Sequence, residues 1–196
     1  MYQEWRKFMC EQQFEATSNI LTMINWQYFP KSDKVTDKLL QTIQVFKDKE
    51  SEIDSEAKDK SNMIDSNTVL SILKDGLLTI GYQVEVSKSG DGKIAVPVLY
   101  GRNGKPEKSF FADGYHTQDE IVLEVEAAAA VANNRFLKDL FEACVMDNVK
   151  YCIIAVRNTN KTTNQKDFES VMRFIDTVYA SQKLKLPLKG VLIIGY

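Results

Sequence analysis

Three carboxylates in the middle of the chain have the types and the spacing of a cation site. Asp113 ends one predicted strand, and Glu124 and Glu126 stand on the next, predicted over residues 120–126. Because the side chains of a strand alternate between its two faces, Glu124 and Glu126 share one face, roughly 7 Å apart. Apolar residues occupy the other face. Asp113, on the preceding strand, can complete an acidic cluster.

The surroundings of this strand predict that its charged face is covered. A helix rich in apolar residues follows directly, predicted over residues 131–146. A strand that leads straight into such a helix usually lies inside the sheet, beneath that helix. Like charges on a covered face are costly, and a bound divalent cation compensates them because hard cations take carboxylate oxygens. The alternative is an ordinary solvated strand face beside an acidic turn.

Other kinds of chemistry have less support in the sequence. His116 is the only histidine, so schemes that pair it with a serine or cysteine nucleophile depend on one turn residue, which we expect at the surface. Three cysteines, Cys10, Cys144 and Cys152, lack the spacing of a zinc site, and the last two are expected to be core thiols. The glycines form no phosphate-binding loop between a strand and a helix.

Composition indicates an ordinary globular protein. The 196 residues are 44% apolar and 27% charged, and the formal net charge of −2 argues neither for nor against nucleic acid as a partner. The sequence has no run of about 18 apolar residues and no signal-peptide core, so we expect a cytoplasmic protein with no membrane partner.

The order of the predicted elements indicates an α/β fold with a mixed sheet and helices on both of its faces. Residues 3–29 have a helical period that Pro30 ends, and a second helix is expected near residues 38–46. The charged segment 47–60 is the expected boundary between an N-terminal helical region, 1–60, and a core, 61–196. In the core we expect helices and strands over residues 69–78, 82–86, 94–100, 110–115, 120–126, 131–146, 151–156, 168–179 and 190–195. Pro97 indicates an edge position or a break in its strand.

This order and the carboxylate pattern resemble the PD-(D/E)xK nuclease superfamily, which has the restriction-endonuclease-like fold. Ala112-Asp113 stands where the family has Pro-Asp, and Glu124-Val125-Glu126 stands where it has Asp/Glu-x-Lys. The glutamate in place of lysine resembles type II restriction enzymes of the BamHI and BglII kind. The resemblance covers roughly residues 64–196, and the N-terminal helices match nothing in it.

The resemblance implies a Mg²⁺-dependent DNA endonuclease, with Mn²⁺ as a substitute. Asp113 and Glu124 are the expected metal ligands, and Glu126 is expected to orient or deprotonate the attacking water. Lys138, on the following helix, could take the place of the missing lysine, or it could simply extend from a helix flank. The buried face of that helix is predicted from these residues: Ala130, Asn133, Leu137, Leu140, Phe141 and Cys144.

Double-stranded DNA is the expected substrate, cut by a homodimer whose N-terminal helices dimerise or clasp the DNA. The polar loop 157–166 could meet phosphates or base edges, or it could be an ordinary surface loop. Two modest lysine clusters, at residues 31–38 and 183–189, are weaker candidates. The alternative function is a catalytically inactive protein of the same fold that binds nucleic acid or a partner protein. A nuclease acting on RNA or damaged DNA is a weaker third reading, and no residue identifies a cognate methyltransferase.

Overall fold

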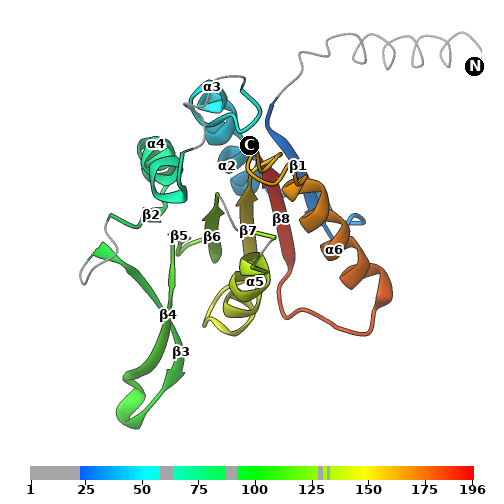
Figure 1. Cartoon of the computed structure of the whole chain (residues 1–196). Coiled ribbons are helices and arrows are strands. Elements are labelled where there is room, and N and C mark those ends of the chain that lie inside the picture. The colour runs from blue at the N-terminus through cyan, green and yellow to red at the C-terminus, as the bar shows by residue number, and fades with distance from the viewer. Residues whose placement is uncertain (1–22, 58–63, 87–91, 128–129, 132) are drawn as a thin grey trace, which may run out of the picture.

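A six-stranded mixed sheet forms the centre of the molecule (Figure 1). The computed structural model describes residues 23–57, 64–86, 92–127, 130–131 and 133–196. Across the sheet the strands run in the order β1, β8, β7, β6, β5, β2. Their bounds are β1 Asn25–Phe29, β8 Gly190–Gly195, β7 Tyr151–Val156, β6 Ile121–Glu126, β5 Gly114–His116 and β2 Gln83–Val84.

The three middle strands are parallel, and the outer ones are antiparallel to their neighbours. β7 and β8 are apolar almost throughout, and residues 152–156 and 190–195 are all buried. Such continuous apolar runs are typical of parallel strands that are covered on both faces. The two strands predicted over residues 151–156 and 190–195 are therefore confirmed.

Helices cover both faces of the sheet (Figure 1). On one face, α2 (Asp37–Asp48), α3 (Glu50–Ile53) and α4 (Ser66–Thr79) share a core with Ile121, Leu123 and Val125 of β6. On the other face, α5 (Arg135–Val145) and α6 (Asp167–Ser181) share a second core that includes Val122. The predicted α/β class and the mixed sheet with helices on both sides are confirmed.

A β-hairpin extends from the main sheet as a separate two-stranded sheet (Figure 1). It consists of β3 (Ile94–Tyr100) and β4 (Pro106–Ala112), joined by a turn that includes the short 3₁₀ helix Arg102–Gly104. The bounds of β3 are the predicted ones. The pairing register shifts beyond Pro97, as expected for a proline that lacks a backbone donor.

The prediction of a helix through residue 29 is wrong for its last part, because residues 25–29 form β1, which pairs with β8. Residues 3–22 of that predicted helix lie outside the described part of the chain. Leu39 and Phe46 of α2 are fully buried in the same core as β6. The described part of residues 1–60 thus packs into one structure with residues 61–196, whereas its predicted role in dimerisation or DNA binding stays a prediction.

Local signals set the ends of α2 and α4. Thr36 caps α2 by accepting a hydrogen bond from Leu39 N, and Asp65 caps α4 by accepting one from Thr68 N. Gly81, which the sequence predicts as the stop of α4, has a φ of +96°. Within the described ranges, no helix combines the length and the apolar character needed to cross a membrane.

Candidate functional site

Three carboxylates lie abreast at the β2 side of the sheet. β5 pairs antiparallel with both β2 and β6, and Gly114 of β5 lies between Val84 of β2 and Leu123 of β6. The next residues in the same pairing are Glu85, Asp113 and Glu124, which therefore lie in a row across the three strands. The backbone N–H of Glu85 donates to the carbonyl of Asp113 at 2.8 Å. Residues paired across a sheet point to the same face, so the row faces the side that α5 covers.

Asp113 occupies the single residue between β4 and β5, where the chain passes from the hairpin into the main sheet. Its Oδ2 accepts a hydrogen bond from Val125 N at 2.8 Å, which ties it to β6. Burial raises the pKa of Asp113 to about 6, and the nearby carboxylates of Glu85 and Glu126 raise it as well. The hydrogen bond from Val125 works in the opposite direction and is too weak to cancel these effects.

Glu124 lies in the middle of this acidic group. Burial raises the pKa of Glu124 well above its ordinary value, and the charges of Asp113 and Asp139 add to that effect. Lys138 lowers it only in part. The expected pairing of Asp113 with Glu124 in one site is therefore what the fold brings about.

Asp139 of α5 belongs to the same group, although the sequence analysis did not select it. The residue is only 7% exposed, and its Oδ2 is buried without a hydrogen-bond partner. Burial raises the pKa of Asp139 to about 7, and Glu126 is the next largest cause. A buried, unpartnered carboxylate oxygen that faces other carboxylates is a position where a cation is favourable.

The predicted buried face of this helix is confirmed for Ala130 and Leu140, which are buried, while Leu137 and Cys144 are partly buried against the same core. It is wrong for Asn133 and Phe141. The residues of α5 that are buried are Phe136, Asp139, Leu140 and Ala143. From the predicted face, Asn133 is exposed and Phe141 is 53% exposed. The helix begins at Arg135 instead of Val131, because Asn134 has a left-handed φ of 51°. The sequence does not predict Asp139 at this position, because aspartate is seldom found in a protein core.

Two cations stand at the rim of the acidic group. Arg135 Nη1 lies 3.6 Å from Glu126 Oε2, and the backbone oxygen of Glu126 accepts a hydrogen bond from Tyr196 Oη at 3.1 Å. Lys138, with a side chain that is 67% exposed, lies 3.0 Å from Glu142 and 3.7 Å from Asp139 Oδ1. Lys138 is close enough to Glu124 to lower its pKa, but its ion pairs are with Asp139 and Glu142, so its predicted role stays a prediction. Arg135 is a second cation, which the sequence does not predict.

We call Glu85, Asp113, Glu124, Glu126 and Asp139 the carboxylate cluster. As the side chains stand, no three of the described His, Cys, Asp and Glu residues converge closely enough to share a metal ion. The donor chemistry nevertheless suits a hard cation, because every donor is a carboxylate oxygen and one of them is buried without a partner. The residues present therefore fit Mg²⁺ in type and charge.

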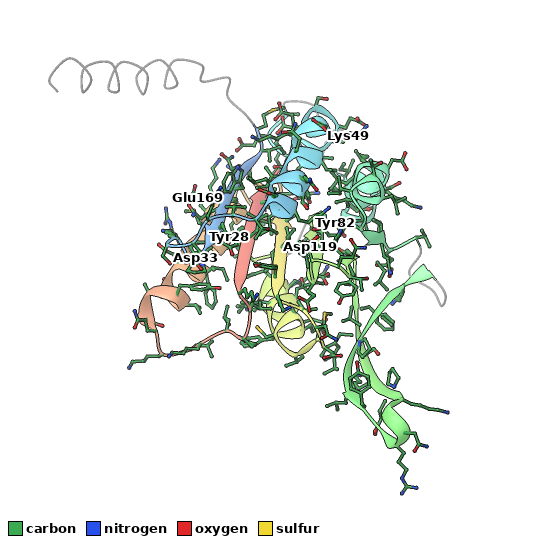
Figure 2. The ribbon with its side chains drawn as sticks, turned by 180° about the vertical axis from the view of Figure 1, so that it is seen from behind. Tyr28, Asp33, Lys49, Tyr82, Asp119 and Glu169 are labelled. Carbon is green, nitrogen blue, oxygen red and sulfur yellow. The ribbon has the colours of Figure 1, made fainter. Side chains whose placement is uncertain are left out.

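The prediction that His116 is a surface residue is wrong. It is 2% exposed, its Nδ1 accepts from Asp119 N at 3.1 Å, and its Nε2 lies 3.2 Å from Ile80 O. The ring packs edge-on against Tyr82, with centroids 5.1 Å apart, and Figure 2 shows Tyr82 and Asp119 together on this side of the molecule. Alternation along β5 turns His116 toward α4, away from the carboxylate cluster.

The loop predicted to reach DNA is partly buried. Residues 157–160 are all buried, and Asn158 and Thr159 hydrogen-bond to earlier parts of the chain. Asn158 Nδ2 donates to Met23 O at 2.6 Å, Asn158 Oδ1 accepts from Asn25 at 3.0 Å, and Thr159 Oγ1 donates to Glu56 at 2.6 Å. Residues 157–160 are therefore not a groove-reading surface, while residues 162–164 of the loop are exposed.

No protein-family model and no curated protein matches this chain. The resemblance to the PD-(D/E)xK superfamily therefore stays a prediction from the motif and from the order of elements. Any function for the chain has to follow from the geometry and the chemistry of the carboxylate cluster.

Proposed function

We propose that this protein is a Mg²⁺-dependent endonuclease that hydrolyses phosphodiester bonds of DNA, of the type II restriction kind, and acts as a homodimer. The observation that carries the proposal is the carboxylate cluster itself. Its five acidic side chains come from four separate segments, and Asp139 and Glu124 have raised pKa values because burial and like charges disfavour their ionised forms. Sites that perturb pKa values in this way are often functional.

The order of elements around the cluster supports a nuclease of the PD-(D/E)xK type. Asp113 precedes β5, Glu124 and Glu126 lie on the adjacent β6, and α5 follows and covers them. This is the succession of Asp, strand turn, Glu-x-Glu and helix on which the resemblance was based. Glu126 takes the lysine position, so Lys138 or Arg135 has to provide the positive charge near the phosphate.

The residues of the cluster divide into ligands and proton carriers. Mg²⁺ bound by Asp113 and Glu124 would supply charge stabilisation and a more acidic water. Glu126, which is paired with Arg135 at the C-terminal end of β6, would orient that water. Asp139 has a pKa of about 7, which lets its carboxylate accept a proton near neutral pH. Lys138 offers its charge to a phosphate oxygen from the rim.

The test is cleavage of plasmid and phage DNA by the full chain with Mg²⁺, with Mn²⁺ and with EDTA. We expect discrete fragments that require the metal, and a loss of rate of about 10³-fold or more for Asp113→Asn, since a metal ligand is removed. Glu169→Gln is the matched control, because it removes one carboxylate from an exposed position on α6 and should cut normally. Equal cleavage by Asp113→Asn and the parent protein would refute the proposal.

One observation favours a second candidate, an inactive protein of this fold that binds nucleic acid or a partner protein. Two ion pairs, Arg135 with Glu126 and Lys138 with Asp139, neutralise part of the carboxylate cluster without any metal ion. Calorimetric titration separates the candidates. The nuclease should bind Mg²⁺ or Mn²⁺ saturably and lose that binding in Asp113→Asn, whereas the inactive protein should bind DNA and show no such metal binding.

A further inference from the structure

The β3–β4 hairpin carries a charge opposite to that of the molecule as a whole. Residues 93–112 contain four cations, Lys93, Arg102, Lys105 and Lys108, and a single carboxylate, Glu107. Their net charge is therefore +3, while the whole chain has a net charge of −2. A concentration of positive charge on one projecting element is the electrostatic signature of a surface that binds a polyanion.

Three of these four cations are exposed and so available to a partner, and Lys93 is partly buried. Among the described residues, none of them forms an ion pair with a carboxylate, and Arg102, Lys105 and Lys108 are exposed. Lys93 lies over the ring of Phe111 at 4.7 Å, and Lys108 lies over the ring of its neighbour Phe110 at 5.6 Å. These aromatic contacts orient the ammonium groups without neutralising their charge.

Contacts with the segment that follows α5 hold the hairpin in place next to the carboxylate cluster. Asp147 N, just beyond α5, donates to Pro97 O at 2.8 Å, and Tyr100 Oη donates to Asp147 Oδ2 at 2.5 Å. Val96 and Ala112 are buried in the core that α5 shares. At its other end β4 runs directly into Asp113, so a ligand held along the seven residues of each strand, roughly 23 Å, extends to the cluster.

We propose that the β3–β4 hairpin is a DNA-binding arm that contacts the phosphate backbone of the duplex that the carboxylate cluster cuts. The inference rests on the proposed function and adds the surface that holds the substrate. A two-stranded ribbon has the width of the major groove, and lysine and arginine are the usual contacts to phosphates. Because the acidic cluster repels a polyanion, attraction has to come from elsewhere, and the hairpin supplies it next to Asp113.

The test compares two charge-matched triple variants of the full chain. Arg102→Gln, Lys105→Gln and Lys108→Gln remove three exposed cations from the hairpin. Lys183→Gln, Lys185→Gln and Lys189→Gln remove three exposed lysines from the segment between α6 and β8. This segment is the rival DNA-binding candidate that the sequence also indicates, so the second variant serves as the control that decides between the two surfaces. Fluorescence anisotropy with a labelled duplex of about 20 base pairs is measured in EDTA over a range of salt concentrations, and circular dichroism checks that both variants fold.

We expect the hairpin variant to bind the duplex at least about tenfold more weakly, with a salt slope that is smaller by about 2 to 3 because fewer counterions are released. The control variant should bind within about twofold of the parent protein. Equal weakening in both variants, no duplex binding by the parent, or stronger binding of a single strand of the same length would overturn the proposal. Because EDTA prevents cleavage, this outcome is independent of the cleavage test with Asp113→Asn, so the arm and the nuclease can fail separately.

Discussion

Two groups of polar side chains, each partly buried, lie near the carboxyl ends of the parallel strands, and they differ in how their hydrogen bonds are satisfied. The first, which we call the polar junction, consists of Ser55, Glu56, Asn158 and Thr159. Ser55 Oγ donates to Tyr196 O and accepts from Asn158 N, and Thr159 binds Glu56. Glu56 has a lowered pKa, chiefly because Thr159 donates to it. In this region polar groups satisfy one another.

The carboxylate cluster is the opposite case. Its acids face one another, the pKa values of three of them are raised, and Asp139 Oδ2 has no partner. The polar junction thus stabilises the fold, whereas the carboxylate cluster destabilises it. The presence of the cluster therefore has to be explained by something other than stability. The cation binding proposed above would provide that explanation, because a bound cation would reverse the sign of the electrostatic contribution.

Asn158→Ala tests the polar junction and should destabilise the fold at every pH. It removes the acceptor for Asn25 and the donor to Met23 O, and leaves both of those groups without a partner. We expect the free energy of unfolding to fall by about 2–3 kcal/mol, as is usual when a buried polar network is broken. Chemical denaturation at pH 6 and pH 8, with and without Mg²⁺, should give the same loss each time. A loss that disappears on adding Mg²⁺ would contradict the assignment.

Asp139→Asn tests whether the carboxylate cluster destabilises the fold in the absence of metal. The pKa of Asp139 rises from 3.8 to about 7 on folding, so the folded state binds the proton more tightly and stability falls as the pH rises from about 4 to about 7. Without metal, the variant should therefore be more stable than the parent by roughly 4 kcal/mol at pH 8, and nearly equally stable at pH 4. The parent should gain stability from Mg²⁺ at pH 8, and the variant should gain less.

Asp167→Asn is the control for that experiment. Asp167 of α6 is also buried, and burial raises its pKa to about 6, but its charged neighbour is Arg157 instead of another acid. The variant should show a similar change with pH, since its folded pKa is also raised. Its response to Mg²⁺ should equal that of the parent protein. A diminished response would mean that the metal effect is not specific to the cluster.

Lys138→Met should have the smallest effect on stability, and it tests whether Lys138 belongs to the site. The exposed pair of Lys138 with Glu142 contributes little to stability, about 0–1 kcal/mol. If Lys138 replaces the family lysine, the rate of cleavage should fall about fivefold to tenfold while the stabilisation by Mg²⁺ stays the same. Lys185→Met, at an exposed position outside the cluster, is the control and should cut normally. Unchanged cleavage by Lys138→Met would remove this residue from the site.

Local patterns were sufficient for most of the fold. β3, β7 and β8 have the predicted bounds, because their apolar runs are short and end at glycine or polar residues. β1 was missed because its aromatic residues fit a helical period as well as a strand, and its partner β8 lies about 165 residues later in the chain. Only the tertiary pairing with β8 decides between the helical and the strand period, so the local sequence alone does not predict this strand.

The site was predictable in part. Asp113, Glu124 and Glu126 were found because strand alternation alone puts acids on a covered face. Glu85 and Asp139 were not found, because their places depend on the pairing of β2 with β5 and on the rotation of α5 about its axis. A carboxylate flanked by Phe136 and Leu140 on a helix is the signal that could have indicated Asp139, since charged residues in an apolar face are rarely without a role.

The pairing of β1 with β8 also has a consequence for the order of folding during synthesis. Residues 25–29 are synthesised about 165 residues before residues 190–195, their partner strand within the described part of the chain. Until then β1 presents an unpaired edge that carries Trp26, Tyr28 and Phe29, the kind of segment that invites wrong pairing. The unit from β5 to β7 can form earlier, because its contacts are closer in sequence. We therefore expect β1 to join the sheet after that unit has formed.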